Sequence, residues 1–310
     1  MTSTSITAAM PTRAGANPAL LSLLAGALAI ALAPILVRVS ELEPVATAFY
    51  RLVIALPFFW LGMFTERRAH RMTASAPVST ADAALMVLAG LMLAGDLALW
   101  HLSITMTSVA KATLFNNCAP VFVALLGWLL FRERIRLGLV VALAVSLSGM
   151  ALLIGDGLFL AAGAHQDEQW RGDAIAVSTA AFYAVYLMAV KRLRATHSTS
   201  VIMAGSSAAA TLALAVAAWI EGGPMLPATA WGWGVVLALG VVCHVIGQGL
   251  ITHALAHLPV TFSSIGLLVQ PVAAAALAWI LFGEALGPLQ WLGGTLALVG
   301  ITLARRVSSR

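Results

Sequence analysis

Pro120–Glu133 reads PVFVALLGWLLFRE, and Pro271–Glu284, which begins 151 residues later, reads PVAAAALAWILFGE. The two segments align without a gap, and the Pro, Trp, Phe and Glu of the first recur at the same positions in the second. Leucine and alanine matches are expected by chance in a chain rich in both, but agreement of these four residue types at one offset is not. The sequence therefore predicts two copies of one structural unit.

The composition is that of a polytopic membrane protein. Hydrophobic residues make up 61% of the chain and charged residues 9%, against about half and about a quarter in a soluble domain. A bilayer that sorts basic residues to one side accounts for the net charge of +5, so we expect no nucleic-acid partner. Cys118 and Cys243 both fall in apolar stretches, and a disulfide framework is not expected.

Ten apolar stretches are long enough, at about 20 residues each, to cross about 30 Å of hydrocarbon. They lie near 19–39, 44–64, 82–104, 109–131, 137–155, 172–191, 199–220, 230–252, 260–282 and 288–306. With a cytoplasmic N-terminus, thirteen of the 17 Lys and Arg residues fall on the cytoplasmic side. The positive-inside rule therefore predicts an all-α protein of ten transmembrane helices with both termini in the cytoplasm.

Each copy of the repeat holds five helices, and an odd number makes the second copy enter the membrane from the opposite face. We therefore expect two inverted five-helix repeats, an arrangement that places substrates near the bilayer midplane where the copies meet. The expected organisation is a disordered tail at 1–18, the first repeat at 19–155, an outside linker at 156–171, the second repeat at 172–307 and a tail at 308–310.

Two prolines at equivalent positions predict interrupted helices. Proline has no N–H to donate, so Pro120 frees the carbonyl of Asn116 and Pro271 frees that of Leu267. An unpaired carbonyl in lipid costs several kcal/mol unless a cavity, water or ligand meets it. A packing kink satisfied by a neighbouring helix is the alternative for each proline. The symmetric pair favours a cavity.

Several segments together resemble the EamA-type branch of the drug/metabolite transporter superfamily, over roughly residues 19–307. They are ALAPILVRVS (31–40), PVATAFYRLVIALP (44–57), SVAKATLFNNCAPVFVALLGWLLFRER (108–134), AFYAVYLMAVKR (181–192) and HLPVTFSSIGLLVQPVAAAALAWILFGEAL (257–286). Members often carry a Trp-Gly type pair in the first helix, where this chain has Ala31–Pro34. The resemblance implies metabolite transport without ATP, mostly export across the bacterial inner membrane. Amino-acid exporters, including the YddG-like aromatic branch, are the nearest group.

Two charged residues lie within predicted spans at similar depth. Arg51 lies seven residues from the outer end of its span, about 10 Å deep, and Asp96 about eight residues, about 12 Å deep. Arg51 could attract a substrate carboxylate, while Asp96 meets an ammonium group or takes up a coupling proton. The alternative is a structural Arg51–Asp96 salt bridge, because buried charges are costly when unpaired.

Amide side chains mark both proline sites. Asn116 and Asn117 lie beside the carbonyl that Pro120 releases, and Gln270 directly precedes Pro271. They are candidates for binding an α-amino or α-carboxyl group, and hydrogen bonding between helices is the alternative.

His244 and Gln248 are spaced i, i+4 in a predicted helix, so they share a face that is either wet or paired. His244 joins Asp96 as a candidate for proton coupling, and a satisfied buried histidine is the alternative.

Aromatic residues complete the candidate substrate site. Trp100 lies one turn after Asp96 and could stack on a flat substrate or hold its ammonium group by cation–π attraction. Membrane-belt or packing roles are the alternative for a tryptophan. The other aromatic-ring candidates are Tyr50, His101, Tyr183 and Tyr186.

The sequence argues against an enzyme, because it holds no His-Glu-x-x-His, phosphate loop or comparable catalytic set. His253 and His257 lack a carboxylate or cysteine companion, so neither a metal nor another cofactor is expected. We therefore expect a secondary transporter in the lipid bilayer that exports small zwitterions, with aromatic or other apolar amino acids favoured. Alternatives are another metabolite class (nucleobase, drug-like cation or sugar derivative) and, less favoured, a membrane receptor. The sequence does not decide between a monomer and a homodimer.

Overall fold

The computed structural model describes residues 13–69, 78–106, 109–131, 136–154, 166–282 and 287–308, and within these ranges every regular element is helical. The first half contains α1 (Arg13–Ile30), α2 (Ala33–Arg38), α3 (Pro44–Ala69), α4 (Thr80–Met106), α5 (Val109–Asn116), α6 (Ala119–Phe131) and α7 (Leu137–Ile154). The second half contains α8 (Gln166–Leu193), α9 (Thr199–Glu221), α10 (Ala230–Ala238), the π-helix η4 (Leu239–Gln248), α11 (Gly249–Ala254), α12 (Val260–Gly266), α13 (Val269–Phe282) and α14 (Pro288–Ser308).

Seven spans in the described part of the chain are long and apolar enough to cross a membrane. They are Pro18–Arg38, Pro44–Glu66, Thr80–Ser103, Trp170–Leu193, Thr199–Glu221, Ala230–Ala254 and Val260–Leu281. Two shorter apolar helices run over Leu114–Leu129 and Leu137–Leu153. Each of these nine overlaps a predicted span, and α14 overlaps the last one.

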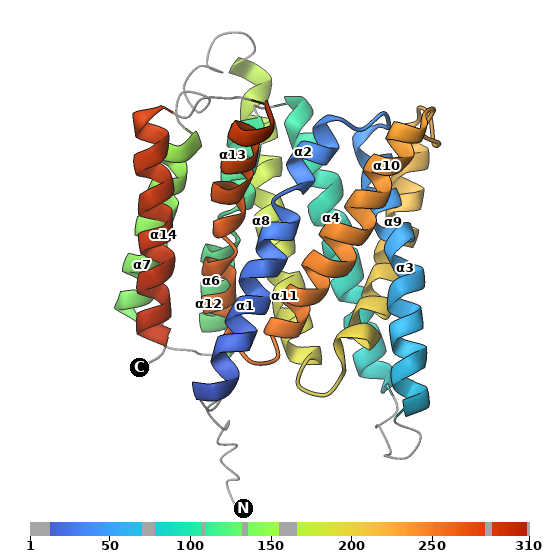
Figure 1. Cartoon of the computed structure of the whole chain (residues 1–310), viewed down its shortest axis with the longest axis horizontal. Helices are drawn as coiled ribbons and strands as arrows, with labels where there is room; N and C mark the ends of the chain where they lie inside the picture. The colour runs from blue at the N-terminus through green and yellow to red at the C-terminus, as the bar shows by residue number, and fades with distance from the viewer. Residues whose placement is uncertain are drawn as a thin grey trace, which may run out of the picture.

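The helices form one bundle, with α7 and α14 at one edge and α3, α9 and α10 at the other (Figure 1). The start of α1 and the end of α14 lie at the same end of the bundle (Figure 1). Large hydrophobic side chains such as Leu129, Leu212 and Ile280 are exposed on its outside. Such a surface suits a protein whose solvent is lipid.

Helix contacts between the two halves are reciprocal. The pair formed by α4 and α8 has its counterpart in the packing of α1 against η4 and α11, and the pair formed by α4 and α9 in the packing of α3 against η4. The equivalent helices α3 and α9 contact each other, as do α7 and α14. This pattern is the one that a twofold relation between two copies of one unit produces.

Glycines bring α7 and α14 into backbone contact. A Cβ added to Gly149 would lie 2.3 Å from the backbone nitrogen of Ala297, and one added to Gly293 would lie 2.3 Å from that of Leu153. No larger residue fits at either position without moving a helix. Small residues at a crossing allow this close approach in membranes, where packing rather than water release drives helix association.

Both prolines of the repeated segment follow a break in their helix. α5 ends at Asn116 and α6 begins at Ala119, while α12 ends at Gly266 and α13 begins at Val269. The two breaks agree with the 151-residue offset to within one residue. The carbonyl of Leu267, expected to be unpaired, instead accepts the backbone N–H of Gln270 at 2.9 Å. A tight turn thus gives the Leu267 carbonyl the hydrogen bond that Pro271, which has no N–H, cannot donate.

A third break and a π-helix were not expected from the sequence. Ala31 and Leu32 form a turn between α1 and α2 just before Pro34, so the first predicted span is also discontinuous. The predicted span at 230–252 changes to π-helical hydrogen bonding over Leu239–Gln248. π-helical stretches are uncommon and occur frequently at functional sites.

Candidate functional site

A cavity of about 150 Å³ lies where the three helix breaks face α3, α4, α8 and η4. At about 30 Å³ per water molecule in the liquid, it has room for about five water molecules. The break at Asn116–Pro120 and the break at Leu267–Pro271 both contribute to its wall. Its polar lining consists of Thr47, Arg51, Asp96, Trp100, His101, Asn116, Asn117, Tyr183, Gln248, Ser264 and Gln270.

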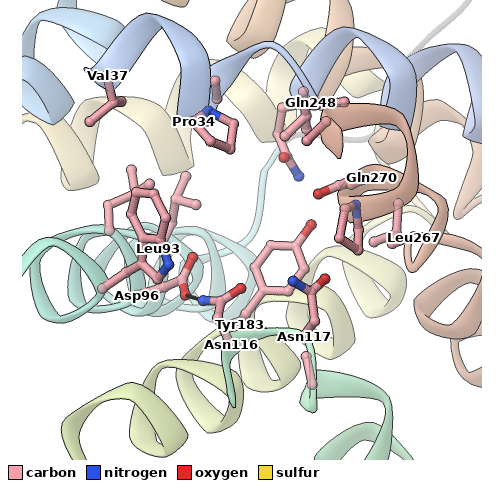
Figure 2. Close-up of a pocket in the computed structure, with 18 of the residues that line it drawn as sticks. Pro34, Val37, Leu93, Asp96, Asn116, Asn117, Tyr183, Gln248, Leu267 and Gln270 are labelled. Atoms are coloured by element: carbon pink, nitrogen blue, oxygen red, sulfur yellow. Dashed lines mark hydrogen bonds between the residues drawn. The ribbon is translucent and has the colours of Figure 1, made fainter. Parts of the chain in front are cut away.

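Asp96 is held by an amide at one side of the cavity. Asn116 donates through its Nδ2 to Asp96 Oδ1 at 2.8 Å (Figure 2). The same nitrogen donates to Thr179 Oγ1 at 2.9 Å. The Thr179 hydroxyl donates to the carbonyl of Ala176 at 2.7 Å, so it can only accept from the amide. Both amide hydrogens of Asn116 are therefore used. Its carbonyl oxygen and Asp96 Oδ2 remain as acceptors.

Arg51 lines the same cavity from α3, and its Nε is buried without a hydrogen-bond partner in the described part of the chain. A direct Arg51–Asp96 ion pair, the alternative considered for these two residues, is not found among the described residues. Asn116 serves as the hydrogen-bond donor to the carboxylate instead. The cavity thus holds a cation and an anion that are not bonded to each other.

His101 lines the cavity, and one of its ring nitrogens is buried without a hydrogen-bond partner among the described residues. Its Nδ1 lies 2.6 Å from the carbonyl oxygen of Leu97, which can only accept, so Nδ1 carries the hydrogen. Nε2 is buried and has no partner within the described residues. The ring also contacts Trp100 edge to face, with ring centres 5.0 Å apart.

The opposite side of the cavity carries neutral polar groups. Asn117, Gln248, Gln270 and the hydroxyl of Tyr183 point toward one another across it (Figure 2). Gln248 donates through Nε2 to the hydroxyl of Tyr186 at 3.1 Å, and the rings of Tyr183 and Tyr186 stack with centres 5.8 Å apart. These contacts fix Gln248 and Tyr183 in place.

Three candidate residues lie outside the cavity. Tyr50 packs edge to face on Trp233, with ring centres 5.7 Å apart. Tyr186 is fully buried behind Tyr183. His244, predicted to share a face with Gln248, has its Nε2 3.0 Å from Ser207 Oγ in α9, whereas Gln248 lines the cavity. Both His244 and Gln248 lie in the π-helix.

Pro34, Thr47 and Ser264 also line the cavity, but they were not among the site residues expected from the sequence. Thr47 lies one helical turn before Arg51, so i, i+4 spacing would have placed the two on one face. Pro34 could have been found by the argument applied to the other two prolines. No sequence signal marks Ser264. Within the described residues, no group of three or more His, Cys, Asp and Glu side chains could hold a metal ion.

Apolar helices whose interrupted members surround a cavity lined by both apolar and polar side chains are typical of membrane transporters. The chain belongs to the EamA-like transporter family, whose sequence profile matches it twice, at residues 17–155 and 170–306. The resemblance to the drug/metabolite transporter superfamily is thereby confirmed.

Several curated proteins are similar to this chain. The pseudopaline exporter CntI of Pseudomonas aeruginosa is 27% identical over 75% of this chain and 78% of its own length. The threonine/homoserine exporter RhtA of Escherichia coli is 30% identical over 71% of this chain and 72% of its own. A solved crystal structure, 20% identical, covers 96% of this chain and 99% of that one with a TM-score of 0.77, which shows a shared fold.

Proposed function

We propose that this protein is a secondary transporter that exports amino acids across the bacterial inner membrane by alternating access. The observation that carries the proposal is the cavity itself, whose lining holds the guanidinium of Arg51 and the carboxylate of Asp96 with no ion pair between them among the described residues. A zwitterion supplies one partner for each. The names of the related exporters support the same substrate class.

The proposed topology has ten transmembrane helices, two inverted repeats at 19–155 and 172–307, and both termini in the cytoplasm. The reciprocal helix contacts support the inverted relation. The shared location of the start of α1 and the end of α14 supports an even number of crossings (Figure 1). The outside linker at 156–171 and the tail at 1–18 lie largely beyond the described residues.

In the proposed complex, the substrate carboxylate lies against Arg51 and its ammonium group against Asp96 and the carbonyl oxygen of Asn116. Charge-assisted hydrogen bonds of this kind are about twice as strong as neutral ones. Trp100, Leu93 and Leu97 line the α4 side of the cavity and suit the carbon skeleton of the substrate. The preference for aromatic or other apolar side chains remains a prediction.

Rocking of the two repeats about this cavity would expose it to one face of the membrane at a time. Asp96 is the proposed proton carrier, because it is the carboxylate that the substrate ammonium group would contact. A proton and a substrate would then compete for one site, which is the requirement for antiport. His244, the other candidate, contacts Ser207 outside the cavity.

Liposomes containing the purified protein test the proposal directly. Labelled amino acids, nucleobases, sugars and organic cations are compared side by side for saturable uptake. We expect saturable flux of amino acids that falls in Arg51→Gln and Trp100→Ala, with Trp219→Ala, an exposed position on α9, as the control. Saturable flux of another class with none of amino acids would refute the proposal.

A further inference from the structure

We propose that the preferred substrate is an amino acid whose side chain ends in an uncharged hydrogen-bonding group, such as a hydroxyl or a carboxamide. This inference rests on the proposed function, because it assumes that the α-amino and α-carboxyl groups occupy the charged side of the cavity. It departs from the expectation of an aromatic or other apolar side chain, because the proposed side chain has carbon along its length but a polar group at its tip.

The first step is the position of the neutral polar groups. Asn117 lies within the first helix break, between α5 and α6, and Gln270 lies in the first turn of α13 after the second, so each of these breaks brings a neutral amide to the cavity. Gln248 and the Tyr183 hydroxyl complete the cluster on the side away from Asp96 and Asn116 (Figure 2). A side chain extending from a zwitterion held by Asp96 would end among these groups.

The second step is their hydrogen-bonding capacity. The Gln270 carboxamide has no hydrogen-bond partner within the described part of the chain, and Gln248 uses its Nε2 on Tyr186 while its amide oxygen remains an acceptor. The cluster therefore offers both donors and acceptors. A hydroxyl or carboxamide, which also donates and accepts, is complementary to it.

The third step is charge. Arg51 and Asp96 carry the formal charges in the described lining of the cavity, and the two ends of the zwitterion neutralise both. A third charge on the substrate side chain would have no counter-charge and would be costly to desolvate. Lysine, arginine, aspartate and glutamate are therefore poor substrates in this account.

The fourth step separates polar from apolar tips. An apolar tip beside Gln248 and Gln270 would leave the Gln248 amide oxygen and the Gln270 carboxamide without a hydrogen-bond partner. Sites built to hydrogen-bond a substrate group discriminate strongly against an isostere that lacks it, whereas apolar pockets discriminate weakly.

Isosteric pairs provide the test. Competition against a labelled amino acid in liposomes compares threonine with valine, asparagine with leucine, and homoserine with norvaline, with phenylalanine included. We expect the polar member of each pair to compete at least about tenfold better, as expected for one lost hydrogen bond of about 1.4 kcal/mol. Gln270→Leu should slow transport of the polar member of each pair more than that of the apolar member, so that the preference is lost, and it should leave the fold intact because no protein hydrogen bond of the Gln270 side chain is removed.

Gln290→Leu is the matched control, since Gln290 accepts the backbone N–H of Gly287 at the start of α14 and does not line the cavity. It should retain the preference. Equal or better competition by the apolar members, or by phenylalanine, would overturn the inference and leave amino-acid transport standing. A preference unchanged in Gln270→Leu would also overturn it. Absence of any amino-acid flux would instead refute the proposed function.

Discussion

Asn116 Nδ2 lies 2.8 Å from Asp96 Oδ1 and joins the helix break after α5 to the middle of α4. The same nitrogen reaches Thr179 in α8, so one amide connects three helices at the cavity. Because a proline follows the break, the end of α5 has no continuous helix to hold it in place. The hydrogen bond from Asn116 to Asp96 holds the end of α5 in place and leaves Asp96 Oδ2 available to a ligand.

Asp96→Asn should lower amino-acid transport at least about tenfold, since a hydrogen bond to a charged group contributes about 1.5–3 kcal/mol. The amide oxygen can still accept from Asn116, so the fold should be retained. The response of transport to an imposed pH gradient should also disappear. Transport is measured in liposomes at several pH gradients.

His244→Gln is the control for that experiment and should leave the response to pH unchanged, because His244 contacts Ser207 outside the cavity. A full transport rate in Asp96→Asn would refute the role of its charge. A pH response lost only in His244→Gln would transfer the coupling role to the histidine.

Lys191→Met should lower the melting temperature. The Lys191 ammonium group donates to the carbonyls of Leu255 at 2.7 Å and Leu258 at 2.9 Å, which follow α11. Hydrogen bonds from a charged group contribute about 1.5–3 kcal/mol when partly buried. Arg192→Met removes an equal charge from the next, exposed position and should have little effect. Equal melting temperatures of the two variants in detergent would contradict this assignment.

Gly149→Ala should destabilise the protein, because the new methyl group would meet the backbone of α14 at 2.3 Å. Overpacking costs about 1–3 kcal/mol, and more when the obstacle is backbone. At Gly234 a Cβ meets nothing within 4 Å, so Gly234→Ala should stabilise its helix by about 0.5–1 kcal/mol. Thermal unfolding of the two variants side by side distinguishes the cases. An unchanged melting temperature in Gly149→Ala would show that α7 and α14 pack less closely.

Glu41 should make stability depend on pH. Its carboxylate accepts the side-chain hydroxyl of Thr229 and the backbone N–H groups of Ala228 and Thr229 before α10. The Thr229 hydroxyl bond, followed by these backbone bonds, lowers the pKa of Glu41 below its usual 4.5 although burial opposes this. A lowered folded-state pKa contributes stability above the unfolded value, and that contribution is lost as the pH falls through the folded value.

Wild type should therefore melt above Glu41→Gln at neutral pH, and the difference should vanish on acidification below about 4.5, the ordinary glutamate pKa. Melting curves from pH 7 to 3 measure this. A difference that grows on acidification would contradict the assignment of these hydrogen bonds.

The sequence predicted the cavity from its prolines. Pro120 and Pro271 recur at one offset in otherwise apolar spans, and the loss of a backbone donor at each is a local consequence of residue type. Arg51, Asp96, Trp100 and the amides near the breaks could be named as candidates because polar groups are rare in lipid. The same reasoning applied to Pro34 would have located the third break.

Other features depend on contacts that no sequence pattern reveals. Gly240 packs against Ile54 and Gly247 against Ile30, and nothing in LGVVCHVIGQ distinguishes the π-helix from a regular turn. The i, i+4 spacing of His244 and Gln248 does not tell which of the two side chains reaches the cavity. Tyr50 adjoins Arg51 in the sequence and Tyr186 lies one turn after Tyr183, but whether such a neighbour reaches the cavity depends on which helices pack around it.

The central claim, that the cavity between the helix breaks is the transport site, is tested most directly by a single cysteine at Ala274, which lines it. Cys118 and Cys243 are first replaced by serine, which preserves their hydrogen bonds to backbone carbonyls. Modification by a membrane-impermeant thiol reagent is then measured from each side of the membrane, with and without substrate amino acid. The account predicts labelling from both sides that saturating substrate blocks. Labelling that the transported amino acid leaves unaffected would contradict it.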